Sequence, residues 1–236
     1  MKKYWLSGAL LLLLLLTLSG CFFREPEDLY QSPEQSADYL SLTQTIRNVK
    51  DSLAQEYGVE VEDVSVMSGD NTALIQLQDL DRDGERETAV TFFRVSEAEK
   101  PLKIYFFTRT AEDTYTVSAM VEGNGTAIYR VDYVDLNGSG CKEVVVSWQM
   151  STGVYLLGAY SLEEAMVRSL QYAASAPAGS ASAQGLPDRE ALRATEWMTT
   201  VYDNYALYDL DQDTRTELAV VRVDKAGTNS AVDLYG

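Results

Sequence analysis

The chain has 236 residues, 46% apolar and 23% charged, which is enough for one large or two small folded domains. Its formal net charge is −17, and so acidic a surface repels phosphate backbones and excludes nucleic acid as a natural partner. The sequence contains no histidine, which excludes histidine acid–base catalysis, Ser-His-Asp and Cys-His nucleophile systems, and most zinc and haem sites.

The first part of the chain has the features of a secretory signal. Lys2 and Lys3 form a basic start, and an apolar core of signal-peptide length follows at residues 10–18. Residues 4–23 are also just long enough to span a bilayer, so an uncleaved transmembrane anchor is the alternative.

Small residues precede the only cysteine of this region, in the run LSGC that ends at Cys21. The run resembles the lipobox of bacterial lipoproteins, in which the cysteine receives a diacylglyceryl group and becomes the new N-terminus. The resemblance implies a signal peptide at 1–20 and a lipidated Cys21 that anchors the protein to the membrane, at the outer face of the bacterial cytoplasmic membrane. Cys141 then remains as a single thiol, with no visible base that would make it a nucleophile.

Residues 21–40 are predicted to be the lipidated cysteine and a polar tether, followed by a helix at 41–58. Ser41 and Gln44 match a capping box at the start of this helix, and Gly58 is suited to its C-terminal end. One helical face carries the apolar residues Leu42, Ile46, Val49 and Leu53. We expect this helix to pack on the body of the protein rather than to carry chemistry.

Residues 59–236 alternate short runs rich in Val, Ile, Tyr, Phe and Thr with turn residues, which predicts a mainly β domain. Three segments of this domain repeat: DLDRDGERETAVTFF begins at Asp79, DLNGSGCKEVVVSWQ at Asp135 and DLDQDTRTELAVVRV at Asp209. Each has Asp-Leu-Asp/Asn, a turn, a glutamate eight residues after the first aspartate, and an apolar run. The segments VYLLGAYSL and MVRSLQY after the second repeat are both predicted to be strands.

About four antiparallel strands are predicted per repeat unit, which is typical of a β-propeller blade. The units are expected at about 65–125, 126–172 and 200–236, with a flexible insertion of small residues at 173–187 and a short helix after it. Two units and part of a third cannot close a ring. We therefore expect an open, partial propeller or a fragment of a longer protein, and favour the fragment.

The run DLDRDGERE from Asp79 to Glu87 resembles the FG-GAP and VCBS repeats of integrin-α-like β-propellers. The likeness covers about residues 70–236, and in that family such a loop holds calcium between two strands of a blade. Calcium takes six to eight oxygen ligands, and carboxylates at alternate positions can converge on one ion if the loop curls. The first loop would use the carboxylates of Asp79, Asp81, Asp83 and Glu87 and the carbonyl of Glu85. The alternative is a metal-free turn, in which these side chains accept nearby backbone N–H groups.

The other two repeats depart from this pattern. The second offers Asp135, Asn137, Ser139 and Glu143, of which only two are charged, so we expect weaker binding. The third offers the full set of Asp209, Asp211, Asp213 and Glu217. Its sixth position is Thr214, which resists a positive φ, so we expect that loop to distort or to bind less well.

These features together favour a non-enzymatic binding or scaffolding module on the cell surface, with structural Ca²⁺ and a protein or glycan as its partner. One alternative is an enzyme, or an enzyme accessory, that acts on cell-surface polysaccharide through a pair of carboxylates. The other is a substrate-binding or sensor lipoprotein with a small-molecule pocket.

Overall fold

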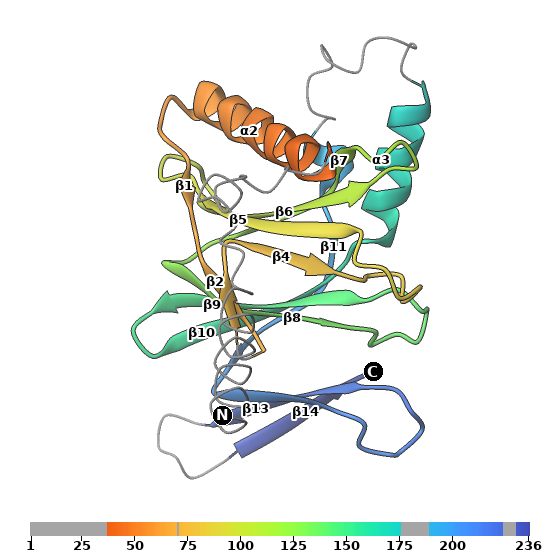
Figure 1. Cartoon of the computed structure of the whole chain (residues 1–236). Helices are drawn as coiled ribbons and strands as arrows, with labels where there is room; N and C mark the ends of the chain where they lie inside the picture. The colour runs from red at the N-terminus through yellow and green to blue at the C-terminus, as the bar shows by residue number, and fades with distance from the viewer. Residues whose placement is uncertain (1–36, 70, 176–188, 224–229) are drawn as a thin grey trace, which may run out of the picture. The chain divides into compact units, whose positions relative to one another are not determined.

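The computed structural model describes residues 37–69, 71–175, 189–223 and 230–236, which belong to one compact unit, Ala37–Gly236 (Figure 1). The predicted mainly β class and the N-terminal helix are confirmed. The strands of the described residues form three open sheets, and no closed barrel or propeller is found among them. The predicted signal peptide and Cys21 lie outside the described residues, and none of the described helices has the length and apolar character needed to cross a membrane.

Helix α2 spans Ala37–Tyr57 and so begins at least four residues before the predicted start, within the predicted tether. The predicted capping box is wrong because Ser41 lies inside the helix. Its hydroxyl instead accepts the backbone N–H of Tyr115 at 2.9 Å, and the Gln44 amide donates to Asn48 at 2.8 Å. Ser41 therefore fixes the helix to a neighbouring strand rather than ending it.

The apolar face and the end of α2 follow the prediction. Leu42, Val49 and Leu53 are buried, as expected from their spacing. Gly58 adopts a φ of 69° and donates its N–H to the Ala54 carbonyl at 2.9 Å, which is the geometry that ends a helix at a glycine.

The first sheet is an antiparallel meander in which four consecutive strands pair in chain order. These strands are β4 (Ile75–Gln78), β5 (Thr88–Arg94), β6 (Leu102–Arg109) and β7 (Tyr115–Gly123). The short strand β1 (Glu62–Asp63) also pairs with β5, beyond the end of β4.

The second sheet has the same meander at its centre, extended at one edge by two short strands. The four main strands are β8 (Ala127–Val134), β9 (Glu143–Ser151), β10 (Val154–Ser161) and β11 (Thr195–Tyr202). The added strands are β2 (Val66–Ser68) and β3 (Asn71–Ala73), which the sequence placed in the first unit. The second sheet therefore includes residues up to Tyr202, and the third sheet begins at β12.

Two helices interrupt the second sheet between β10 and β11. Helix α3 (Glu163–Ser175) contains the segment MVRSLQY, so the predicted strand there is wrong. Ala165 and Ser169 are buried at a helical spacing, and two glutamates in the first turn favour the N-terminal end of a helix. The helix also includes the first three residues of the predicted insertion, whose remainder lies outside the described residues. Helix α4 (Arg189–Leu192) confirms the short helix predicted after it, although strand β11 follows almost at once.

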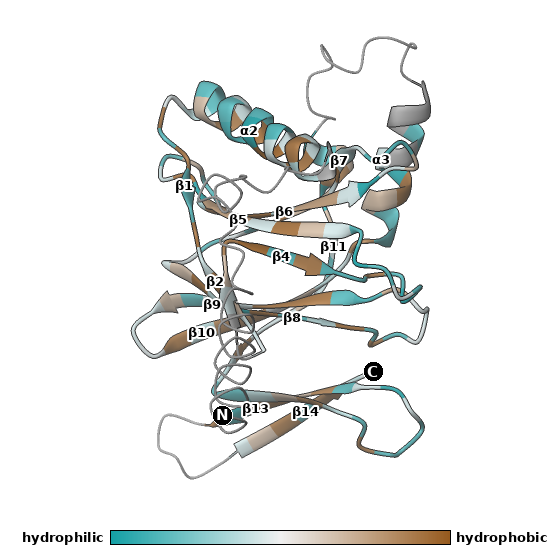
Figure 2. Cartoon of the chain, in the orientation of Figure 1, coloured by the Kyte–Doolittle hydropathy of each residue, from teal (hydrophilic) through white to brown (hydrophobic). Residues whose placement is uncertain are grey.

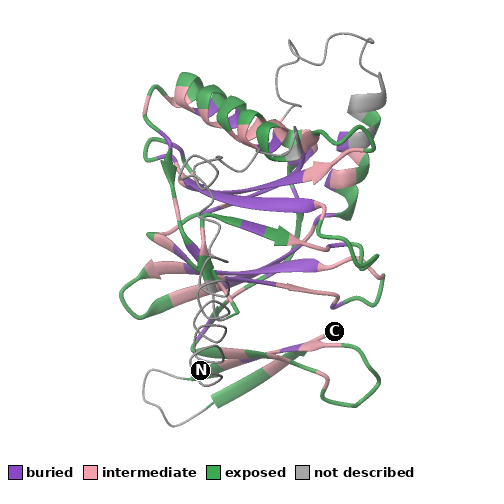
Figure 3. Cartoon of the chain, in the orientation of Figure 1, coloured by how far each residue is buried: buried purple, intermediate pink, exposed green. Residues whose placement is uncertain are grey.

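The third sheet has three described strands, β12 (Asn204–Tyr208), β13 (Glu217–Val223) and β14 (Ser230–Tyr235). Leu218 and Val220 of β13 are fully buried, whereas Val232 and Leu234 of β14 are about 60% exposed (Figure 3). One face of this sheet is thus covered and the other meets solvent.

Three apolar clusters join these elements into layers. Alternate residues of β5 show the arrangement: Ala89 and Phe93 pack with α2, while Val90 and Phe92 pack with residues of the second sheet such as Trp148. A third cluster joins the second and third sheets. Apolar residues accordingly follow the strands of the first two sheets and fill the inward side of α2 (Figure 2). The near-continuous apolar runs of β5 and β9 are inner strands covered on both faces, whereas the third run, β13, is buried on one face only.

Candidate metal centre

Each of the three repeated segments forms the loop between two consecutive, antiparallel strands of one sheet. Loop 1 (Asp79–Glu87) joins β4 to β5, loop 2 (Asp135–Glu143) joins β8 to β9, and loop 3 (Asp209–Glu217) joins β12 to β13. The sequence repeat therefore coincides with a structural repeat.

The three loops share a set of hydrogen bonds between side chains and backbone. The side chain at position 3 accepts the N–H of position 5, and the side chain at position 5 accepts the N–H of position 7. The carboxylate at position 1 accepts the N–H of position 6, at 3.1 Å in Asp79–Gly84, 3.1 Å in Asp135–Gly140 and 3.0 Å in Asp209–Thr214. These bonds curl each loop so that the side chains at positions 1, 3 and 5 turn inward.

Two positions in every loop have the left-handed backbone that favours glycine. A positive φ at position 6 was expected from the sequence. A positive φ at position 4 was not expected, because only the second repeat has glycine there. The φ angles at positions 4 and 6 are 62° and 96° (Arg82, Gly84), 69° and 92° (Gly138, Gly140), and 64° and 76° (Gln212, Thr214).

Loop 3 does not distort to accommodate Thr214, contrary to one of the two outcomes expected. Thr214 takes the φ of 76° that the shared loop shape requires. For a residue with a side chain this conformation costs about 1–2 kcal/mol. The loop therefore keeps its shape and carries strain.

Carboxylates gather in loops 1 and 3. Within the part of the chain that the structure describes, two groups of acidic side chains have ligand oxygens that all lie within 4.8 Å of one another. They are Asp79, Asp81, Asp83 and Glu87, and Asp209, Asp211, Asp213 and Glu217. The structure thus brings together both predicted carboxylate sets. The carboxylate of Glu85 instead pairs with Arg109 at 2.9 Å, so the predicted role of Glu85 concerns its carbonyl alone.

Some of the inward carboxylate oxygens are buried and have no hydrogen-bond partner among the described residues. In loop 1 these atoms are Asp79 Oδ1 and Glu87 Oε2, in loop 2 the atom is Asp135 Oδ1, and in loop 3 it is Asp209 Oδ1. A buried, unpaired carboxylate oxygen is costly, and a bound cation removes that cost. Among the described residues, loops 1 and 3 combine such an oxygen with four clustered carboxylates, so their oxygen sets fit a metal ion, and loop 1 has two such unpaired oxygens.

The electrostatics of loop 1 also favour a bound cation. Burial raises the pKa of Glu87, a backbone hydrogen bond lowers it, and the negative charges of Asp81 and Asp83 raise it further, with a net shift above the ordinary value. Four carboxylates so close together repel one another unless a cation lies among them.

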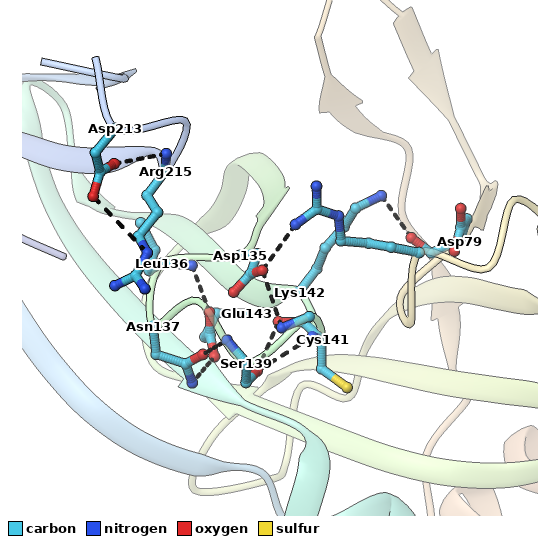
Figure 4. A network of polar contacts seen from close by, with 12 residues as sticks. Asp79, Asp135, Leu136, Asn137, Ser139, Cys141, Lys142, Glu143, Asp213 and Arg215 are labelled. Carbon is cyan, nitrogen blue, oxygen red and sulfur yellow. Dashed lines mark hydrogen bonds and ion pairs between the residues drawn. The ribbon is translucent and has the colours of Figure 1, made fainter. Parts of the chain in front are cut away.

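Loop 2 is held instead by donors of the protein itself. Both oxygens of the buried Glu143 are used, by the backbone N–H of Leu136 at 2.8 Å and the Asn137 amide at 2.6 Å. The Arg82 guanidinium donates to Asp135 Oδ2 at 3.0 Å (Figure 4). A side-chain cation from loop 1 thus pairs with Oδ2 of the first carboxylate of loop 2, whereas Oδ1 of that carboxylate has no partner among the described residues. The weaker metal binding expected of loop 2 stays a prediction.

Neighbouring loops contact each other, which the sequence did not predict. Lys142 of loop 2 donates its ammonium group to the Asp79 carbonyl at 2.6 Å and its backbone N–H to the Leu80 carbonyl at 2.8 Å. On the other side, a Cβ added to Gly138 would lie 3.1 Å from the Arg215 guanidinium of loop 3. Loop 2 therefore lies between loops 1 and 3.

Cys141 lies in loop 2 and is not activated. Burial, with the negative charges of Glu163 and Asp81 next in size, raises the pKa of its thiol above the ordinary value. A nucleophilic cysteine needs the opposite shift.

No family model, curated protein or solved structure matches the chain. What the site can do is therefore argued from its own atoms. Two clusters of carboxylates could hold a metal ion, and their geometry alone does not select one hard cation over another.

Proposed function

We propose that the protein is a lipid-anchored, non-enzymatic binding or scaffolding module of the bacterial cell surface, with loops 1 and 3 holding structural Ca²⁺. The observation that carries the metal assignment is the pair of buried, unpartnered oxygens in loop 1, Asp79 Oδ1 and Glu87 Oε2. Both belong to the same carboxylate cluster.

The donor set favours calcium over other ions. Every candidate ligand is an oxygen, which suits hard cations and not the softer metals that prefer sulfur or imidazole. Ca²⁺ accepts six to eight oxygens in irregular arrangements, whereas Mg²⁺ demands a near-ideal octahedron and retains several waters. Four carboxylates on a short curled loop, with room for a carbonyl and water, match the calcium requirement better.

The ion would act as a structural element. It would neutralise the mutual repulsion of the carboxylates and hold the β4–β5 and β12–β13 connections in place. No base, nucleophile or activated thiol accompanies either cluster among the described side chains, so the site is better suited to stability than to catalysis.

The arrangement of the loops supports the relationship to FG-GAP and VCBS repeats. Three runs of consecutive antiparallel strands begin at β4, β8 and β12, and each carries the acidic motif between its first two strands. In this interpretation the sheets are blades of an open, partial propeller. The lipid anchor is proposed from the LSGC run at Cys21 alone.

Calorimetry of the mature protein, first in EGTA and then with added Ca²⁺ or Mg²⁺, tests the metal proposal. We expect Ca²⁺ to raise the melting temperature and Mg²⁺ to raise it less. A melting curve that neither the chelator nor the added calcium changes would contradict the proposal. Mass spectrometry of the membrane-bound protein tests acylation of Cys21, and a Cys21→Ala variant should leave the membrane fraction.

A further inference from the structure

A second feature, separate from the acidic loops, is a cavity of about 450 Å³ between the second and third sheets. It lies among residues of β8, β10, β11 and β12. Its volume is in the range of about 300–1,000 Å³ that is usual for small-molecule sites. We name it the tyrosine pocket, after Tyr129, Tyr155, Tyr202 and Tyr205.

The four tyrosines form a continuous row along the pocket. Their ring centroids are 5.0 Å apart for Tyr129 and Tyr155, 6.0 Å for Tyr155 and Tyr202, and 5.3 Å for Tyr202 and Tyr205. Tyr129 is 49% exposed and Tyr202 only 7%, so the row runs from solvent toward the interior. Such a row offers a large apolar surface together with phenolic hydroxyl groups.

A fixed polar group stands beside the row. Asp132 is 9% exposed and receives two hydrogen bonds from Arg130, one from Nε to Oδ2 and one from Nη2 to Oδ1, each of 2.9 Å. The Tyr205 hydroxyl donates to the same carboxylate at 2.5 Å. These bonds restrict the side chains before any ligand arrives, which lowers the cost of ordering them on binding.

The charges of the pocket disfavour an anion. Arg130 and Asp132 form a neutral pair, whereas Asp203, the other carboxylate of the lining, accepts the backbone N–H of Val223 at 2.5 Å and keeps its negative charge. An organic cation would be attracted by this carboxylate and by the aromatic faces, but an ammonium group without hydroxyls would leave the phenolic hydroxyl groups of the pocket unused. An anion would meet the field of a chain whose net charge is −17.

The aromatic rings and the phenolic hydroxyl groups together favour an uncharged ligand that covers the rings and exchanges several hydrogen bonds. Sugars have this combination, because a pyranose ring carries apolar C–H faces and is surrounded by hydroxyl groups. The Tyr129 and Tyr155 hydroxyls accept or donate no hydrogen bond within the described residues, so both remain available to such a ligand.

We propose that the tyrosine pocket binds a neutral saccharide, which packs on Tyr129 and Tyr155 and hydrogen-bonds near the Arg130–Asp132 pair. The inference rests on the proposed binding role and names the chemical class of its partner.

Isothermal titration calorimetry of the calcium-loaded protein against cellotetraose, maltotetraose and chitotetraose at millimolar concentration tests the inference. Tetragalacturonate is the acidic comparison and choline the cationic one. We expect at least one neutral oligosaccharide to bind. The variant Tyr129→Ala should weaken that binding at least about tenfold without unfolding the protein, because the side chain is half exposed. Tyr155→Ala should act in the same direction.

Tyr208→Ala is the matched control, because Tyr208 is 66% exposed on β12 and does not line the pocket. It should leave binding unchanged. The inference is overturned if none of the three neutral oligosaccharides binds, if Tyr129→Ala and Tyr208→Ala affect binding equally, or if choline or tetragalacturonate binds more tightly than all of them. The melting temperature in EGTA and in Ca²⁺ is read separately. Failure of sugar binding with an intact calcium response rejects only the saccharide, whereas sugar binding without a calcium response rejects only the metal.

Discussion

The substitution Asp79→Asn should have opposite effects on stability without and with calcium. In loop 1 the carboxylate oxygens lie within 4.8 Å of one another. Two unit charges at that distance repel by about 1 kcal/mol in water and by about 3 kcal/mol at an effective dielectric constant near 20. Asp81 and Asp83 are exposed, so the lower value applies.

Asparagine removes one of these charges and keeps an oxygen that can accept the Gly84 N–H. In EGTA we therefore expect the variant to be more stable than the wild type by about 1 kcal/mol. For a folded unit of this size that corresponds to a rise of roughly 2–4 °C in melting temperature.

In the presence of calcium, the wild type should be more stable than the Asp79→Asn variant. An ion present at a hundred times its dissociation constant stabilises the wild type by about 2.7 kcal/mol per site, or roughly 5–11 °C. The variant should lose most of this gain at loop 1, and Asp209→Asn should do the same at loop 3. Asp51→Asn removes the same charge from the exposed face of α2 and serves as the control.

Scanning calorimetry of the three variants and the wild type, each in EGTA and in Ca²⁺, measures both effects. An Asp79→Asn protein that melts below the wild type in EGTA and responds to calcium as fully as the wild type would refute this reasoning. It would mean that the carboxylates of loop 1 act only as acceptors for backbone N–H groups.

Three further substitutions test other parts of the structure. Thr214→Gly should raise the free energy of unfolding, measured in urea, by about 0.5–1 kcal/mol. Glycine relieves the strain of a left-handed φ of 76°, and the greater flexibility of the unfolded chain offsets part of that effect. An unchanged free energy of unfolding would show that the loop is unstrained. Gly123→Ala should lower it by about 1–3 kcal/mol, since the new Cβ would lie 2.6 Å from the buried ring of Trp148, and an unchanged urea midpoint would contradict the packing of that ring. Glu122→Gln should lower the free energy of unfolding by about 3–5 kcal/mol near neutral pH, because it leaves the buried Lys103 ammonium without its carboxylate. Burial raises the pKa of Glu122, but the hydrogen bond and charge of Lys103 outweigh burial and hold the pKa below 4.5. The stabilisation of the folded state by ionised Glu122 is therefore present above pH 4.5 and is lost as the pH falls through the folded-state pKa. In urea titrations at several pH values, the free energy of unfolding of the variant should fall less steeply with decreasing pH than that of the wild type.

The sequence was a good guide where the pattern is local. The Asp-Leu-Asp/Asn spacing, the glutamate at position 9 and the apolar run behind it specify a curled loop followed by a strand. All three copies have that form, although the strand after loop 3 is buried on one face only. The buried Leu80 and Leu136 show why leucine recurs at position 2 of the first two loops: it fills the core beneath the turn.

The sequence was a poor guide where distant parts of the chain decide the outcome. Strand β11 pairs with β10 although two helices intervene, and no local signal assigns it to that sheet. MVRSLQY suits a strand as well as a helix, and burial of Ala165 and Ser169 decides for the helix. The tyrosine pocket is also invisible in the sequence, because its four aromatic residues come from four different strands.

The contacts between neighbouring loops make the three turns mutually dependent. Arg82 reaches Asp135 only while loop 1 holds its curled shape, and Gly138 of loop 2 lies against Arg215 of loop 3. A change in the shape of loop 1 would therefore alter the Arg82–Asp135 pair and, through loop 2, the surroundings of loop 3. If loops 1 and 3 hold the proposed ions, we expect binding at one loop to change the affinity of the other.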